Sequence, residues 1–181
     1  MIGNQIIVLT VAADRRIFQR EFAQREFAEM DTKSPLLAKY ARNRAPGVVM
    51  ISELVAYVDG GCLGNPGPSG IGVIISGCAS GPVRIAKWIG HQDNNVAEYA
   101  ALMEALQYAV SLKAQKLHVY SDSEVVVRQM TGEYTCRSPR LYSLHWTCRK
   151  LARSLAFSIS HVPRESNAEA NGLAQSALRR K

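Results

Sequence analysis

From Val48 onward, short apolar runs alternate along the chain with turns rich in glycine and proline. Three such runs lie at residues 53–61, 70–76 and 83–90, and they are separated by GCLGNPGPSG and GCASGP. Short strands joined by turns of this composition predict an antiparallel meander.

The second half of the chain alternates between helical and strand patterns. A long helical pattern at 94–112, a strand at 116–121, a short helix from Asp122, a helical stretch at 141–154, a strand at 156–162 and a final helix follow in that order. Strands that alternate with helices after a meander predict an α/β fold, in which a mixed sheet with parallel crossovers carries helices packed on it.

The first 50 residues show a different pattern. Residues 14–30 place apolar side chains at helical spacing opposite a charged face, which predicts an amphipathic helix. Pro46-Gly47 marks the boundary, so we expect an amino-terminal extension over residues 1–50 and a main domain over residues 51–181. A helical element packed on the sheet, an extra substrate grip and an oligomer contact are all open as roles for this extension.

Composition narrows the class of protein. The chain has 181 residues, 47% of them hydrophobic, which is enough for one sizeable core. Its net charge of +7 favours a polyanionic partner such as nucleic acid. The four cysteines contain no C-x-x-C pair, which argues against a structural zinc and indicates free thiols in a reducing cytoplasm. We expect a cytoplasmic monomer with no obligatory protein partner, no secretory signal and no membrane span.

Three carboxylates occupy positions where burial normally excludes charge. Asp59 ends LVAYVD, a run typical of a strand buried on both faces. Glu98 shares a helix face with apolar side chains four, seven and eleven residues later, so it points toward the sheet. Asp122 directly follows the strand at 116–121, at the edge where open α/β sheets bind ligands.

Each acid also has a local explanation. Asp59 suits a turn before Gly60, Glu98 suits the rim of a core, and Asp122 suits the first turn of a helix with Ser121 and Glu124 as a capping box. Convergence of all three on one point is the simpler interpretation. Because clustered carboxylates repel one another, the cluster requires a divalent cation, and hard oxygen ligands favour Mg²⁺ or Mn²⁺.

Four ordered motifs carry a family resemblance: YVDGG followed by NPGPSGIGVII, then NNVAEYAAL, VYSDSE and HVPRESNAEANGLA. Together they resemble the type 1 ribonuclease H family, in its archaeal-like branch without a basic protrusion, over about residues 54–178. The resemblance implies a five-stranded mixed sheet whose first three strands are antiparallel. It also implies hydrolysis of the RNA strand of RNA/DNA hybrids with two metal ions, leaving 5′-phosphate and 3′-hydroxyl ends, with Asp59, Glu98 and Asp122 as ligands.

The fourth ligand position of that family is normally an aspartate, and this chain has Asn171 there, on a helix that we expect to begin at a capping box of Ser166 and Glu169. An amide oxygen still ligates Mg²⁺, so we expect an active enzyme with a weaker hold on one ion. Two alternatives stay open. The chain is a catalytically silent hybrid-binding module, or it is an unrelated metal-dependent nuclease or phosphatase of the same broad fold.

Further residues follow from the resemblance. Arg164 lies in the loop where relatives keep a residue for product release or proton transfer, and its permanent charge suits phosphate positioning. Glu165 is a weaker second candidate there, and His161 fits a strand end. Trp146 lies in the helical region where the family resemblance implies a groove for the DNA strand, but leucines at 141, 144 and 151 favour core packing for it. The basic side chains at 137, 140, 149 and 150 form either a phosphate-contacting surface or a solvated face.

Substrate-binding candidates lie in the turns and at the helix starts. Gly60, Gly61 and the turn containing Asn65 let backbone N–H groups approach an RNA strand closely, where contacts to the 2′-hydroxyl distinguish RNA from DNA. Asn94 and Asn95 resemble nucleic-acid contacts of the family, with N-capping as the local alternative. Ser123, next to Asp122, completes this set.

Overall fold

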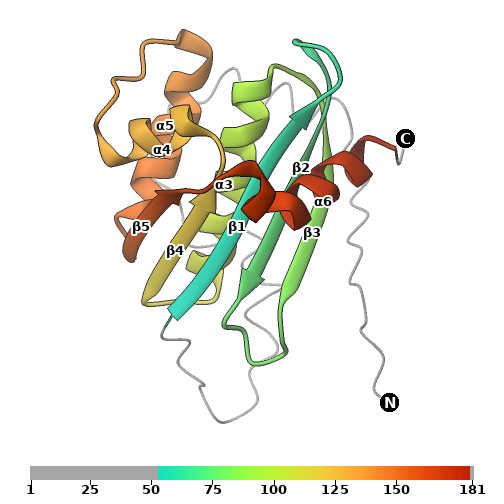
Figure 1. Ribbon diagram of the computed structural model, residues 1–181. Coiled ribbons are helices and arrows are strands. Elements are labelled where there is room, and N and C mark those ends of the chain that lie inside the picture. Colours follow the sequence, from blue (N-terminus) through green and yellow to red (C-terminus); the bar gives the residue numbers. More distant parts are fainter. Residues whose placement is uncertain (1–52, 180–181) are drawn as a thin grey trace, which may run out of the picture. The chain divides into compact units, whose positions relative to one another are not determined.

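The computed structural model describes residues 53–179, so the predicted extension over residues 1–50 lies outside the described residues. Figure 1 shows the elements in chain order. They are β1 (Glu53–Cys62), β2 (Gly67–Ser76), β3 (Val83–Gln92), α3 (Asn94–Ser111), β4 (Lys116–Ser121), α4 (Glu124–Thr131), α5 (Pro139–Ala152), β5 (Ala156–His161), the 3₁₀ turn η1 (Arg164–Asn167) and α6 (Ala168–Leu178).

The five strands form one mixed sheet in the order β3-β2-β1-β4-β5. β1, β2 and β3 pair antiparallel, whereas β4 runs parallel to β1 and to β5. The predicted α/β fold, its meander and its parallel crossovers are therefore confirmed. The central strand β1 has its apolar side chains Leu54, Ala56 and Val58 fully buried on one face, whereas Val55 and Tyr57 on the other face are only partly buried. The predicted burial on both faces is therefore complete on one face only.

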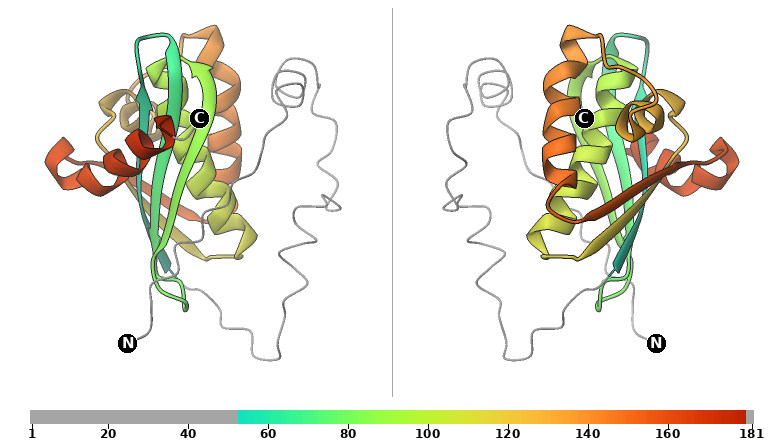
Figure 2. Two further views of the ribbon diagram at one scale, coloured as in Figure 1. Left: turned by 90° about the vertical axis from the view of Figure 1, so that its right-hand side faces the viewer. Right: turned by 90° about the vertical axis from the view of Figure 1, so that its left-hand side faces the viewer.

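Helices cover both faces of the sheet, and neighbouring glycines of β1 show how closely they approach. Successive residues of a strand face opposite sides. A Cβ at Gly60 would clash with the backbone of Ala97 in α3, whereas a Cβ at Gly61 would lie 3.7 Å from the Cβ of Ala174 in α6. Figure 2 shows α3 and α5 on one side of the sheet and α6 on the other.

Several predicted boundaries are corrected by the structure. Half of the predicted GNPGPSG turn belongs to β2, which begins at Gly67. The predicted capping box of Ser121 and Glu124 is wrong, because α4 starts at Glu124 and the Ser123 side chain caps it by accepting from the N–H of Val126. The N-cap of α3 is Asp93, whose side chain accepts from the N–H of Val96 at 2.9 Å.

The start of α6 also differs from the prediction. η1 precedes the helix, so the N-cap is Asn167 and Ser166 makes no capping box with Glu169. The Asn167 side chain makes no capping hydrogen bond either, and its contacts lie across the fold, in the site described below.

Trp146 is exposed, with 47% of its surface accessible, so the expected core packing is wrong. Leu141, Leu144 and Cys148 form the buried stripe of α5 at i, i+3 and i+7, which turns Trp146 away from the core. Lys150 lies over its indole ring, 5.5 Å from the ring centroid. The described helices include none that is long and apolar enough to cross a membrane.

Candidate active site

Asp59 and Asp122 are neighbours because β1 and β4 run in parallel register. Val58 pairs with Ser121, so each acid follows a paired residue at the same level of the sheet. Asp59 is only 3% exposed, and its Oδ2 atom is buried without a hydrogen-bond partner. A buried, unpartnered carboxylate oxygen is costly, which is the condition that a bound cation relieves.

Glu98 reaches the same place from α3. Its helix face buries Leu102, Ala105 and Ala109, as the spacing predicted, and Glu98 itself is 8% exposed. The backbone N–H of Gly60 donates a hydrogen bond to Glu98 Oε2 at 3.1 Å. Only glycine allows α3 to approach β1 this closely. Gly60 therefore leaves space for the helix that carries Glu98, and its N–H fixes the Glu98 carboxylate.

The electrostatics of the carboxylates show that they share one site. Burial, and after it the charge of Asp122, raise the pKa of Asp59 from 3.8 to about 6. Burial, and then the charges of Asp59 and Asp122, raise the pKa of Glu98 well above its usual value. The charge of Asp122 thus disfavours ionisation of Asp59, and the charges of both aspartates disfavour ionisation of Glu98, so the structure brings the three predicted acids together.

Arg164 and Asn171 complete the predicted set around Asp59. The charge of Arg164 lowers the pKa values of both Asp59 and Glu98, so its guanidinium partly compensates the acids. A hydrogen bond with the Asn171 side chain also lowers the pKa of Asp59. Glu165 is exposed in η1, and His161 is the last residue of β5, as predicted.

One residue of the site was missed by the sequence analysis. Asn167 is 1% exposed, and its Nδ2 donates to the backbone oxygen of Val58 at 2.9 Å and to Asp122 Oδ1 at 2.7 Å. From the sequence, Asn167 could be predicted only to lie near the start of the last helix. The partners of its side chain are far away in the chain, so no local pattern indicates them.

The substrate-binding candidates lie at the rim. Asn65 Oδ1 accepts a hydrogen bond from the backbone N–H of Asn94 at 3.1 Å, so the first turn of the meander is tied to the start of α3. Asn95 is exposed beside it. The Ser123 side chain is engaged in capping α4, and neither asparagine is the N-cap of α3.

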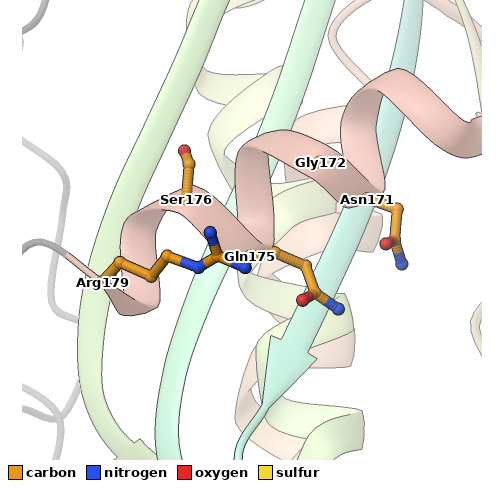
Figure 3. Close-up of a pocket in the computed structure, with 5 residues that line it drawn as sticks. All are labelled: Asn171, Gly172, Gln175, Ser176 and Arg179. Atoms are coloured by element: carbon orange, nitrogen blue, oxygen red, sulfur yellow. The ribbon is translucent and has the colours of Figure 1, made fainter.

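A hollow of about 550 Å³ lies along α6 and has Asn171 in its lining. Figure 3 shows that the side chains of Asn171, Gln175 and Arg179 extend from successive turns of this helix, and Gly172 and Ser176 complete the lining. The hollow therefore extends from Asn171, a predicted metal ligand, to the positively charged Arg179, with the Gln175 amide between them.

The donor set fits a hard divalent cation. Asp59, Glu98, Asp122 and Asn171 offer carboxylate and amide oxygens, and Asp59 Oδ2 is buried without a hydrogen-bond partner. Within residues 53–179, however, no three His, Cys, Asp or Glu side chains are arranged to hold a metal ion by themselves. Mg²⁺ usually binds through one or two carboxylates together with substrate phosphate oxygens, so this set suits an ion that is completed by substrate.

The structure is that of an α/β protein whose mixed five-stranded sheet carries an acidic cluster at the ends of two adjacent parallel strands. Comparison with known proteins makes the class specific. A family model described as reverse transcriptase-like matches residues 57–177. Ribonuclease HI of Halobacterium salinarum is 38% identical over 125 residues, which cover 68% of this chain and 63% of that protein. A bifunctional protein of Mycobacterium tuberculosis is 36% identical over 129 residues, which cover 70% of this chain and 35% of that protein.

Solved structures agree with the sequence matches. The crystal structure of the Halobacterium salinarum RNase H1 matches with a TM-score of 0.68 at 35% identity, covering 72% of this chain and 100% of that one. LC11-RNase H1 in complex with an RNA/DNA hybrid matches with a TM-score of 0.64 at 34% identity, covering 70% of this chain and 96% of that one. The chain belongs to the ribonuclease H family.

Proposed function

We propose that this chain is a metal-dependent endoribonuclease that hydrolyses the RNA strand of RNA/DNA hybrids and leaves 5′-phosphate and 3′-hydroxyl ends. The observation that carries the proposal is the clustering of three acids, one of which, Asp59, has a buried carboxylate oxygen without a hydrogen-bond partner. Two relatives support the substrate: one is named Ribonuclease HI, and another was solved with an RNA/DNA hybrid.

The role of each side chain in the site follows from its position. Asp59, Glu98, Asp122 and Asn171 would hold two Mg²⁺ or Mn²⁺ ions, which would supply activation of the attacking water and neutralisation of the leaving oxygen. Asp59 would be the central ligand, because its pKa is raised by the charge of Asp122 and its own charge raises the pKa of Glu98. Glu98 is oriented by the N–H of Gly60, and Asp122 by the amide of Asn167. Arg164 is exposed beside the cluster, where its guanidinium suits a bidentate contact to the scissile phosphate.

Asn171 gives this site an Asp-Glu-Asp-Asn ligand set with three formal negative charges. Its amide oxygen is a weaker ligand than a carboxylate, and its amide group stabilises the ionised form of Asp59. We therefore expect cleavage that requires a higher concentration of metal ion than a four-acid site. The rival function is a catalytically silent hybrid-binding module. The observation that favours it is Asn171, which stands where the family normally has an aspartate.

The substrate contacts follow from the rim of the site. We assign the RNA contact to Gly61 and to the linked pair Asn65 and Asn94. The N–H of Gly60, which the sequence also suggested for this contact, is engaged with Glu98 instead. Contacts to the 2′-hydroxyl on this side would select RNA over DNA. The net charge of +7 adds affinity for the phosphate backbone that does not depend on sequence.

The test is cleavage of an end-labelled RNA/DNA hybrid over a range of Mg²⁺ and Mn²⁺ concentrations. Asn171→Asp restores the fourth acid, and Asp59→Asn is the inactive control. Cleavage by the parent chain, with Asn171→Asp lowering the metal concentration for half-maximal rate, supports a working neutral ligand. Hybrid binding by the parent without cleavage, and cleavage by Asn171→Asp alone, would establish the silent module instead.

A further inference from the structure

Asn167 is a buried side chain with two partners that belong to different parts of the site. Val58 immediately precedes Asp59 in β1, and Asp122 immediately follows β4. The Asn167 amide donates to the backbone oxygen of Val58, 109 residues away in sequence, and to the Asp122 carboxylate, 45 residues away. One NH₂ group therefore connects both acid-bearing strands to the start of α6.

The chemistry of the two partners fixes the orientation of the amide. A carbonyl and a carboxylate are both acceptors, so the NH₂ end must face them, and only a side chain with two donor hydrogens serves both. Aspartate has the same shape but would repel Asp122, and serine is too short for both contacts. The sequence position is thus restricted to asparagine by hydrogen-bond chemistry as well as by volume.

The other end of the same side chain is left unsatisfied. Asn167 Oδ1 is buried and has no hydrogen-bond partner. A buried acceptor without a partner destabilises the folded state, so the contacts of Nδ2 are retained at a cost to stability. Such a cost is characteristic of a group that serves a site rather than a core.

We propose that Asn167 is a positioning residue for the metal ligands, an inference that rests on the proposed function. Its amide donates a hydrogen bond of 2.7 Å to Asp122 Oδ1, so this ligand keeps its orientation before any cation arrives. Through Val58 it also fixes the first turn of α6 against β1, which sets Asn171, four residues later, beside Asp59.

A matched control is available in α4. Gln129 is also a buried amide, 8% exposed, and its Oε1 accepts a hydrogen bond from the Tyr99 hydroxyl at 2.7 Å. Gln129→Ala therefore removes a buried amide hydrogen bond that involves none of the metal ligands. Asn167→Ala is the test variant, and Asn167→Ser is a second variant that keeps a polar group of smaller volume, for use if alanine prevents folding.

The experiment compares Mn²⁺ affinity of the purified chains by electron paramagnetic resonance, together with thermal unfolding and hybrid-cleavage kinetics. We expect Asn167→Ala to weaken Mn²⁺ binding by about 10- to 100-fold, the range seen when outer partners of metal ligands are removed. The kcat should fall while KM for the hybrid changes by no more than about twofold. Gln129→Ala should lower the unfolding temperature but keep the Mn²⁺ affinity of the parent.

Equal Mn²⁺ affinities for Asn167→Ala and Gln129→Ala would overturn the positioning role and leave Asn167 a structural residue. Failure of the parent chain to cleave hybrid would overturn the proposed function. In that case the Mn²⁺ affinities still decide the role of Asn167, because they require no turnover.

Discussion

Gly60 lies where β1 and α3 approach most closely, so replacing it by alanine tests the architecture of the site directly. The new Cβ would lie 2.5 Å from the carbonyl oxygen of Ala97 and closer still to the backbone nitrogen of Glu98. These are backbone atoms of a helix and cannot turn aside. The same substitution therefore pushes away the helix that carries Glu98 and stretches the hydrogen bond between Gly60 and that residue.

The size of the effect follows from the contact. Carbon atoms in contact lie about 3.5 Å apart, so α3 must move from β1 by roughly 1 Å. Overpacking of this kind costs about 1–3 kcal/mol of unfolding free energy. A misplacement of about 1 Å costs about 100-fold in rate when it displaces a catalytic group.

Urea unfolding and single-turnover cleavage would measure both quantities. Gly61→Ala is the matched control for stability, because its Cβ would meet the Ala174 side chain at an ordinary 3.7 Å. We expect Gly61→Ala to keep the parent's unfolding free energy within about 1 kcal/mol. If Gly60→Ala unfolds at the same urea concentration as Gly61→Ala and keeps the parent's single-turnover rate, the close approach of α3 to β1 is not what places Glu98.

Three further predictions concern charge and helix stability. In metal-free protein, the pKa of Asp59 is raised from 3.8 to about 6, so its contribution to stability is lost as pH rises between these values. Asp59→Asn should therefore raise the unfolding free energy by about 1–3 kcal/mol at pH 7, and a gain that persists at pH 3.5 would contradict this cause. Gly172→Ala, at an open position in α6, should stabilise the chain by about 0.5–1 kcal/mol in thermal unfolding, and a loss would show a contact at that face. Arg179→Ala should weaken hybrid binding and reduce the salt dependence of log Kd by about one phosphate contact, whereas an unchanged slope would remove the α6 hollow from the binding surface.

The order of strands and helices was predictable because it depends on local periodicity. The positions of Asp59 and Asp122 were predictable as well, since each ends an apolar strand and parallel strand ends meet at one edge of a sheet. The inward direction of Glu98 was predictable too, because its spacing from the apolar residues of the same helix places it on the buried face.

Other features of the fold could not be predicted, because the same local sequence pattern is compatible with more than one structure. Ser166 and Glu169 have the spacing of a capping box, but the chain places a 3₁₀ turn there and begins α6 after Asn167. Trp146 and Cys148 are both apolar and only two positions apart in α5, so the local pattern does not show which of them faces the core; the structure buries Cys148 and exposes Trp146. Asn167 was missed because its side-chain partners are set by tertiary packing, with Val58 109 residues distant.

The bridge from Asn167 to Val58 also has a consequence for how the protein becomes active. Contacts that join distant parts of a chain form late in folding, because the loop between them must close first. A chain interrupted before α6 would carry all three acids but neither Asn167 nor Asn171. Under the proposed function, only completely folded chains would therefore cleave the hybrid. Partly folded chains would carry the three acids without the groups that orient them.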